Sequence, residues 1–350
     1  MQALQHKHNK IPRRLRGIRT TGSRKINLKR SEANSAKGQE SQSSKLVLVN
    51  VNFGLYRLKF MGTGKNNNSI TSLLKDKESF LTLPGVFDAL SARIAEKIGY
   101  RAIFQTGYGS AATLLGMPDF GLLNAGETID NAKRIIKSVS IPVIIDIDTG
   151  YGNPLNVWRM VRDLEDMGAG GVFLEDQVWP KRCGHMTGKE VIAKEHYKAK
   201  LRAALDARKS EEFVIVARTD ARATLGLSEA IDRGKEYYET GADVIFVEAP
   251  RTLEELEEIP TRIDAPLVAN MIERGITPNL SSNQLKEIGY KIAVFPLSGL
   301  YSAAFAMHEV FTELKNTGST KKSQEKMVTF DDFNKLVGLS EYMSLAKKYA

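Results

Sequence analysis

The chain lacks several features that would assign it to a class at once. Only one of its 350 residues is a cysteine, Cys183, which excludes an internal disulfide framework and is typical of a reducing compartment. No stretch approaches the roughly 18 consecutive apolar residues that a membrane-spanning helix needs. No glycine-rich phosphate-binding fingerprint follows the first predicted strand, which weakens an open doubly wound nucleotide-binding sheet. We therefore expect a cytoplasmic protein without a membrane segment.

The positive charge of the chain is concentrated in its first part. The formal net charge is +9, yet residues 1–60 hold fourteen lysines and arginines against two acids, whereas the remainder holds 36 basic and 39 acidic residues. The basic balance is therefore not a nucleic-acid footprint of the remainder. We expect no nucleic-acid and no membrane partner for that part of the chain.

Residues 1–67 are interpreted as a separate segment and residues 68–350 as the main folded domain. Residues 1–45 are polar and basic, and such a composition cannot bury enough apolar surface to offset the entropy of ordering. Three interpretations stay open: a disordered tail, a transit-like peptide leading to an organellar matrix, or a start codon assigned too early, with Met61 as the alternative start. Residues 46–60 alternate weakly and could form a strand, for which no partner is evident.

Eight short apolar runs bounded by turn residues follow this segment. They are Phe80–Leu83, Ala102–Gln105, Val143–Ile147, Gly171–Leu174, Phe213–Ala217, Val244–Val247, Leu267–Ala269 and Ile292–Phe295. Helical patterns lie between most of them, namely Ala89–Ile98, Thr128–Ser138, Leu155–Met167, Lys194–Arg208, Ser228–Thr240 and Leu253–Thr261. This alternation predicts an α/β fold, a closed (β/α)8 barrel of the TIM type with a C-terminal helical extension.

Polar residues stand where the apolar runs stop. In such barrels the chemistry lies at the carboxyl ends of the strands. These ends carry Thr106, Gly107, Tyr108, Asp146, Asp148, Glu175, Arg218, Glu248 and Asn270. We therefore expect an acid-rich site at one rim of the barrel.

The pair Asp146 and Asp148 predicts a metal site. The two residues are two apart in a predicted strand, so their side chains should point to the same face. Neighbouring carboxylates repel unless a cation lies between them. With Asp119 and Glu175 nearby, Mg²⁺ (or Mn²⁺) held largely through water is expected, because Mg²⁺ dehydrates reluctantly. The alternative is helix capping or a salt bridge with Arg218.

The sequence Lys181-Arg182-Cys183-Gly184-His185 places the lone cysteine in a polar loop. A packing cysteine usually lies in an apolar run, so a catalytic role for Cys183 is favoured. The neighbouring cations favour the thiolate, whereas burial would favour the thiol. Gly184 and Gly188 suit a loop that closes over a substrate.

Three further rim residues are candidates for substrate binding. Arg218 suits bidentate recognition of a carboxylate or phosphonate, with a buried ion pair to Glu175 or Glu248 as the alternative. Glu248 and Asn270 could orient a substrate carboxylate or brace the rim. The backbone amides of 106–108 could face an anion, or could form a plain turn.

Together these residues resemble the isocitrate lyase and phosphoenolpyruvate mutase superfamily over roughly residues 68–345. The matching segments are Leu83-Pro84-Gly85 with Asp88, Thr106-Gly107-Tyr108, Leu115–Asp119, Asp146–Gly152, Glu175-Asp176-Gln177, Lys181–His185, Arg218-Thr219-Asp220, Val247–Pro250 and Asn270. The resemblance implies a barrel that exchanges its eighth helix with a neighbour, hence a homodimer or homotetramer. It also implies Mg²⁺ bound directly by Asp146 and through water by Asp119, Asp148 and Glu175.

Within that superfamily the lyase branch carries the cysteine loop, and phosphoenolpyruvate mutase itself lacks the cysteine. The resemblance therefore implies carbon–carbon cleavage. The short chain looks like the lyases that act on methylisocitrate or 2,3-dimethylmalate, although the segment 186–188 and residues Arg274 and Ile276 depart from those patterns and leave the substrate open.

The expected reaction is the Mg²⁺-dependent cleavage of a 2-hydroxy di- or tricarboxylate to pyruvate or another 2-oxo acid plus a carboxylate. Cys183 is expected to give a proton to the departing carbon. The expected catalytic residues are Cys183, His185, Arg218 and Glu248. The expected substrate-binding residues are Thr106, Gly107, Tyr108, Gly184, His185, Arg218 and Asn270. The base that takes the hydroxyl proton stays open between Tyr108 and a metal-bound water.

Three alternatives remain at this point. A carboxyvinyl-carboxyphosphonate phosphorylmutase-like enzyme would bind a phosphonate. An oxaloacetate-cleaving enzyme would release a smaller product. A non-enzymatic interpretation takes the basic segment as an RNA- or membrane-binding module on an inactive barrel, against which the intact set of acids and the cysteine argue.

Overall fold

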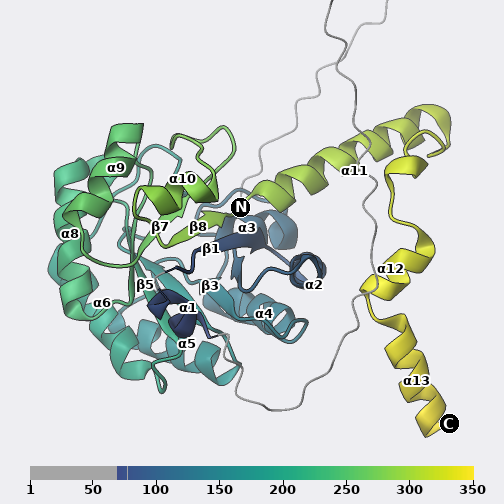
Figure 1. The fold of residues 1–350 in the computed structure, drawn as a ribbon, viewed down its shortest axis with the longest axis horizontal. Helices are drawn as coiled ribbons and strands as arrows, with labels where there is room; N and C mark the ends of the chain where they lie inside the picture. Colours follow the sequence, from purple (N-terminus) through teal and green to yellow (C-terminus); the bar gives the residue numbers. More distant parts are fainter. Residues whose placement is uncertain (1–68, 77) are drawn as a thin grey trace, which may run out of the picture. The chain divides into compact units, whose positions relative to one another are not determined.

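The computed structural model describes residues 69–350 apart from residue 77. The predictions for residues 1–67, including the Met61 start, lie outside the described residues. Eight parallel strands pair in chain order, and the last pairs with the first, so the sheet closes into a barrel (Figure 1). The predicted (β/α)8 barrel is therefore confirmed.

All eight predicted strands are present, with small shifts at their ends. They are β1 (Leu81–Val86), β2 (Ile103–Gln105), β3 (Val143–Asp146), β4 (Gly171–Glu175), β5 (Val214–Thr219), β6 (Val244–Val247), β7 (Leu267–Asn270) and β8 (Ile292–Phe295). The largest difference is in β1, which continues through Pro84 and Gly85. Gly85 is required there because an added Cβ would lie 2.1 Å from the Pro296 carbonyl oxygen.

The predicted helices are also present, and several short ones were not predicted. The helices that match the sequence pattern are α2 (Ala89–Ile98), α4 (Ala125–Ile136), α5 (Pro154–Asp166), α6 (Lys194–Ala207), α8 (Leu227–Thr240) and α9 (Leu253–Arg262). The others in the described part of the barrel are α1 (Ile70–Lys75), α3 (Gly107–Leu115), α7 (Ala221–Thr224) and α10 (Ser282–Glu287). Except for α3, these are only one or two turns long, and so carry little periodicity for a sequence pattern to reveal.

Two apolar layers hold the barrel together. The inner layer contains alternate strand residues, among them Phe104, Ile144, Phe173, Val216 and Phe246. The outer layer packs the intervening strand residues against the helices. Since side chains of a strand alternate between its two faces, the inward positions can be counted from these residues to the end of each strand.

Three helices follow the last strand: α11 (Ser298–Thr317), α12 (Phe330–Leu336) and α13 (Leu339–Tyr349). They form the predicted C-terminal helical extension. None of the twenty residues of α11 is buried, and Figure 1 shows α11 running out from the barrel. No helix in the described ranges has both the length and the apolar character that crossing a membrane requires.

Candidate functional site

Strand alternation aims the predicted site residues at the barrel axis. Six of them lie two positions beyond a buried inward residue of the strand that leads to them, as Asp146 follows Ile144 and Arg218 follows Val216. The other pairs are Phe104 and Thr106, Phe173 and Glu175, Phe246 and Glu248, and Val268 and Asn270. The polar rim is therefore the next layer of side chains above an apolar floor.

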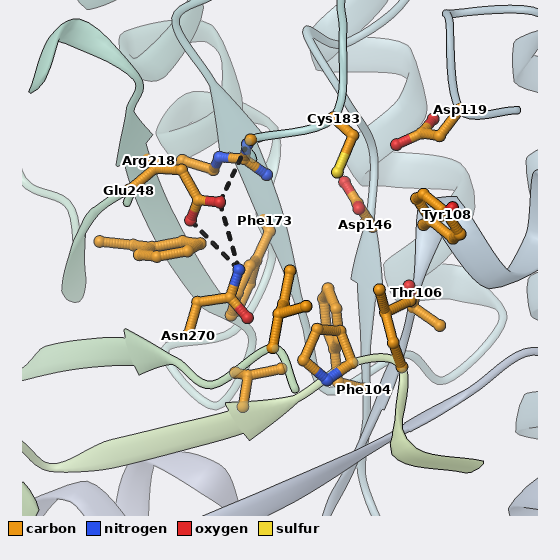
Figure 2. A pocket seen from close by; sticks show the side chains of 16 residues that line it. Phe104, Thr106, Tyr108, Asp119, Asp146, Phe173, Cys183, Arg218, Glu248 and Asn270 are labelled. Carbon is orange, nitrogen blue, oxygen red and sulfur yellow. Dashed lines mark hydrogen bonds and ion pairs between the residues drawn. The ribbon is translucent and has the colours of Figure 1, made fainter. Parts of the chain in front are cut away.

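A pocket opens at this rim. Its lining contains nine of the predicted residues: Thr106, Tyr108, Asp119, Asp146, Cys183, Gly184, Arg218, Glu248 and Asn270. Figure 2 shows two groups of polar side chains on opposite sides of the pocket, with Cys183 between them. We call Asp119, Asp146, Asp148, Glu175 and Lys181 the acid half, and Arg218, Asp220, Glu248, Asn270 and Lys189 the arginine half.

Asp146 and Asp148 come together by a different route from the one predicted. Strand β3 ends at Asp146, so Asp148 does not share a strand face with it. Asp148 instead has a left-handed backbone with φ of 48°, and its amide donates to Asp146 Oδ1 at 3.1 Å. Such a conformation costs free energy in a non-glycine residue and is found most often at functional sites.

Lys181 neutralises this cluster, and the sequence interpretation did not include it among the site residues. Its Nζ lies 2.6 Å from Asp119 Oδ1 and 2.7 Å from Asp148 Oδ1, and all three side chains are buried. Burial acts to lower the pKa of Lys181, but the surrounding carboxylates raise it well above its ordinary value. Its position at the start of the cysteine loop, next to an acid-rich rim, is the feature of the sequence that could have indicated this role.

The single positive charge of Lys181 does not compensate for the burial of all the carboxylates in the acid half. Burial raises the pKa of Asp148 to about 6, with Lys181 opposing that shift, and burial also raises the pKa of Glu175. The Oε1 atom of Glu175 is buried without a hydrogen-bond partner. These carboxylates could receive a divalent cation.

The donor set fits a hydrated ion better than a direct chelate. Among the described residues, no group of three or more His, Cys, Asp or Glu side chains is arranged to bind one metal ion directly. Asp146 faces the pocket together with Asp119, whereas Asp148 and Glu175 do not line it. Carboxylates that do not all converge on one point suit Mg²⁺, which usually keeps several of its waters.

The thiol of Cys183 is kept protonated. Burial raises its pKa to about 11; the backbone hydrogen bond with His185 opposes the shift, and the charges of Asp119 and Glu248 add to it. Of the two opposing influences seen in the sequence, burial outweighs the neighbouring cations. A protonated thiol at neutral pH can donate a proton but is a poor nucleophile.

His185 is fixed in one tautomer by a loop after β7. The Ile276 amide donates to its Nδ1 at 2.9 Å, so a neutral ring must carry its proton on Nε2. Burial lowers the pKa of His185, which favours that neutral form. Its Nε2 is buried without a hydrogen-bond partner, 3.6 Å from Glu248 Oε1, and so is available to donate to a ligand.

Arg218 is the centre of the arginine half. Its guanidinium donates to Asp220 through Nε at 2.9 Å and through Nη2 at 3.1 Å, and Nη1 lies 3.2 Å from Glu175 Oε2. Nη2 also lies 3.9 Å from Glu248 Oε1. The ion pair that the sequence offered as an alternative is thus present, and Arg218 still lines the pocket.

Asn270 completes this half. Its Nδ2 donates to Glu248 Oε1 at 3.2 Å and to Oε2 at 3.3 Å (Figure 2). Because these bonds turn the amide nitrogen toward Glu248, the Oδ1 atom is left buried without a hydrogen-bond partner. It is a free acceptor for a hydroxyl or carboxylic acid group.

The segment 106–108 differs from both sequence interpretations, because it begins helix α3. Thr106 is the N-cap residue, and its hydroxyl accepts from Gly109 N at 3.3 Å. The amide of Thr106 donates to Val86 O and that of Gly107 to Asp146 Oδ2. These two amides are therefore bonded within the protein, Gly107 to the Asp146 carboxylate, and the segment contributes the Thr106 and Tyr108 side chains to the pocket.

Comparison with known proteins agrees with this geometry. Residues 70–315 match the family model described as phosphoenolpyruvate phosphomutase. The chain belongs to that family. The sequence-based assignment to the isocitrate lyase and phosphoenolpyruvate mutase superfamily is therefore confirmed.

Three relatives illustrate the range of activities near this chain. It is 43% identical to 2,3-dimethylmalate lyase of Eubacterium barkeri, over 79% of this chain and 96% of that protein. It is 47% identical to the chloroplastic carboxyvinyl-carboxyphosphonate phosphorylmutase of Arabidopsis thaliana, over 79% of this chain and 83% of that protein. A solved oxaloacetate acetylhydrolase bound to 3,3-difluorooxalacetate has a TM-score of 0.76 and 32% identity, covering 80% of this chain and 96% of that one. The protein is thus an enzyme of this superfamily, and relatives named as lyases support the carbon–carbon lyase class.

Proposed function

We propose that this enzyme cleaves the C2–C3 bond of a 2-hydroxy dicarboxylate of the dialkylmalate type, giving a 2-oxo acid and a monocarboxylate. The observation that carries the proposal is a partly buried, protonated thiol facing the same pocket as a guanidinium. Cys183 and Arg218 both line the pocket. A carbon–carbon lyase needs an anchor for the departing carboxylate and an acid for the carbon beside it, and this pair supplies both.

The lining of the pocket favours a small, alkyl-substituted dicarboxylate. Of the residues that line the pocket in the described part of the chain, Arg218 alone carries a permanent positive charge. The apolar members of the lining are Phe104, Phe173, Phe246, Ile272, Val294, Pro296 and Leu297. One guanidinium matches one departing carboxylate, and apolar walls match methyl groups, whereas the third carboxylate of methylisocitrate would have no second cation there.

A divalent cation, Mg²⁺ or Mn²⁺, belongs to this proposal. Asp146 would hold it directly, and Asp119, Asp148 and Glu175 would hold it through water. When bound, it would neutralise the 2-hydroxycarboxylate end of the substrate and ease the loss of the hydroxyl proton. In the structure, Lys181 supplies the positive charge that neutralises Asp119 and Asp148.

The protein groups then act in sequence. Tyr108 stands beside Asp146 and Asp119 in the pocket, where it can take the hydroxyl proton, directly or through a water. Collapse of the alkoxide to a ketone breaks C2–C3, and the electron pair moves onto the departing carboxylate. Arg218 and the Nε2–H of His185 stabilise this charge, while Asn270 and Glu248 orient the group. Cys183 gives its proton to the new carbanionic carbon. Tyr108 then releases to the solvent the proton that it took, and the thiol regains a proton from the solvent.

The test is a substrate panel with purified full-length protein and Mg²⁺. For 2,3-dimethylmalate we expect equal amounts of pyruvate and propionate, with kcat/KM at least tenfold above that for methylisocitrate, roughly what one unpaired buried charge costs. Turnover of none of the 2-hydroxy dicarboxylates would contradict the proposal.

The phosphonate alternative rests on the 47% identity to the phosphorylmutase. A phosphonate carries more charge than a carboxylate and would again meet one guanidinium in the lining. We therefore expect no change in the ³¹P spectrum of carboxyphosphonate-type substrates. Oxaloacetate, the third candidate, would give oxalate or CO₂ in the same panel.

We also propose that a second copy of the chain covers α11. This helix has no buried residue, and Phe305 and Phe311 on it are 68% and 63% exposed. Exposed aromatic residues at this density, on a helix that leaves its own barrel, mark an interface. The helix exchange implied by the superfamily resemblance would bury them in a homodimer or homotetramer.

Size-exclusion chromatography with light scattering measures the molecular mass of the protein and so tests this interface. Wild type should be an oligomer. Phe305→Asp combined with Phe311→Asp should lower the molecular mass, whereas Lys315→Asp on the same helix should not. A monomeric wild type would contradict the proposal.

A further inference from the structure

A second lysine lies at the far end of the cysteine loop, and neither the reaction proposed above nor the superfamily motifs give it a task. Lys189 has a side chain that is 1% exposed and is paired with Asp220, which is completely buried. A buried ammonium is costly unless its hydrogen bonds and its charge are satisfied. The hydrogen-bond and ion-pair partners of Lys189 therefore indicate its role in the structure.

One partner of Lys189 is the backbone of the catalytic loop itself. Its Nζ donates to the carbonyl oxygen of Gly184, the residue directly after Cys183. On the other side of Cys183, the Arg182 amide donates to Gln177 Oε1 at 3.0 Å, and Gln177 Nε2 donates to the Arg182 carbonyl at 2.9 Å. The cysteine is thus held from both sides, by an amide side chain before it and an ammonium group after it.

The loop needs such a tie because it is pressed against the arginine half. A Cβ added to Gly184 would lie 1.8 Å from Glu248 Oε1 and 2.7 Å from Arg218 Nη2. The backbone at 184 can therefore approach the ends of β5 and β6 only as glycine. A backbone that lies this close to buried polar groups needs an interaction that holds the loop in place and offsets the entropy of ordering it.

The other partner of Lys189 is Asp220, which also binds Arg218. Lys189 Nζ lies 2.9 Å from Asp220 Oδ1, and the same carboxylate accepts two bonds from Arg218. Burial acts to raise the pKa of Asp220, but the charges of Arg218 and Lys189 lower it below its ordinary value. Asp220 is thus shared between two cations, while the Arg218 guanidinium has Glu175 Oε2 as a second acid partner at 3.2 Å.

We propose that Lys189 is a positioning residue that ties the cysteine loop to the end of β5, holding Cys183 over the pocket and sharing the Asp220 carboxylate with Arg218. The kinetic part of this inference rests on the proposed lyase function. The structural part does not, because it concerns the accessibility of Cys183 in the enzyme without substrate.

The test compares Lys189→Met with Lys189→Gln. Both variants lose the charge, but glutamine keeps an N–H donor for the Gly184 carbonyl. The first readout is the rate at which iodoacetamide alkylates Cys183, the only cysteine of the chain, without substrate. We expect an increase of about tenfold in the methionine variant and a smaller one in the glutamine variant, since a freed loop exposes the thiol.

The second readout separates kcat from KM with the substrate found in the panel. Displacement of a reacting group by about 1 Å can cost roughly a hundredfold in rate. We therefore expect kcat to fall by about 10- to 100-fold in Lys189→Met, with partial recovery in Lys189→Gln. KM should rise in both variants, because both lose the cation that shares Asp220 with Arg218.

Lys194→Met is the matched control. Lys194 is also an ion-paired lysine of the same region, bound to Glu236 at 2.6 Å, but its side chain is 32% exposed and lies outside the pocket. It should change neither readout. If no substrate is found, the alkylation comparison still tests the loop tie.

Circular dichroism and thermal melts accompany every variant. If Lys189→Met fails to fold because Asp220 is left underpaired, the double variant Lys189→Met with Asp220→Asn removes that charge and should still show fast alkylation. Wild-type alkylation rates in folded variants would overturn the proposal. Failure of all three variants to fold would also overturn it, because Lys189 would then be needed for folding itself.

Discussion

The two halves of the site neutralise buried charge in different ways. In the acid half, several carboxylates share one ammonium group, Lys181, which is carried by a loop. In the arginine half, a guanidinium at the end of β5 is fixed by the two hydrogen bonds that it donates to a neighbouring carboxylate. The first arrangement has more carboxylates than cations, whereas the second has a cation held in one orientation.

This difference matches the two ends of the proposed substrate. A cluster with more carboxylates than cations suits the end where a hydrated metal ion would bind. A fixed guanidinium suits the end where charge develops and must be met without rearrangement. The loop that begins at Lys181 and ends at Lys189 contributes a lysine to each half, with Cys183 between them.

Removing the metal ion should have the largest effect, because it disables the acid half altogether. We expect EDTA to abolish turnover and added Mg²⁺ or Mn²⁺ to restore it. Asp146→Asn should lose metal binding in calorimetry, while Asp163→Asn, on the exposed side of α5, should bind metal normally. Full turnover in excess chelator would contradict the proposal that the acid half binds a metal ion.

Replacing the thiol between the halves should come next. Cys183→Ser is nearly isosteric but a far weaker acid, so kcat should fall by roughly 10²–10⁴ with KM nearly unchanged. The melting temperature should stay within a few degrees of wild type. Turnover of the substrate at the wild-type rate would mean that Cys183 is not the proton donor.

A charge-conserving change in the arginine half should have a smaller effect. Arg218→Lys keeps the positive charge but loses the bidentate geometry, so kcat/KM should fall by about 10- to 100-fold. Metal affinity should change much less than kcat/KM, because Arg218 contacts only Glu175 of the acids that would hold the metal ion. An equal loss of metal binding would show that the two halves do not act separately.

The pH dependence of the thiol should be the mildest effect. Burial raises the pKa of Cys183 to about 11, so the proton-donating form is present below that pH and is lost only as the pH rises through it. The alkylation rate of the enzyme without substrate should still be climbing at pH 10, about tenfold per pH unit. A plateau near pH 8.5, as in a free cysteine, would contradict this assignment.

Much of the site followed from the sequence because it depends on strand alternation. An apolar run that ends in an acid or an arginine, repeated around a closed barrel, is enough to place Asp146, Arg218 and Glu248 on one rim. The short helices escaped prediction because a turn or two carries little periodicity. Helix α3 escaped for another reason, since Gly107 and Gly109 lie in its first turn and glycine disfavours a helix.

The sequence by itself determined the barrel, its rim and the identity of the chemical groups, because these depend on local patterns of period two and 3.6. Only the tertiary structure decided which charges meet. Lys181 and Lys189 look like surface lysines in the sequence, yet each is buried against acids more than thirty residues away. The protonation of Cys183 was decided in the same way, because burial is a property of the folded chain and outweighs the cations beside it in the sequence.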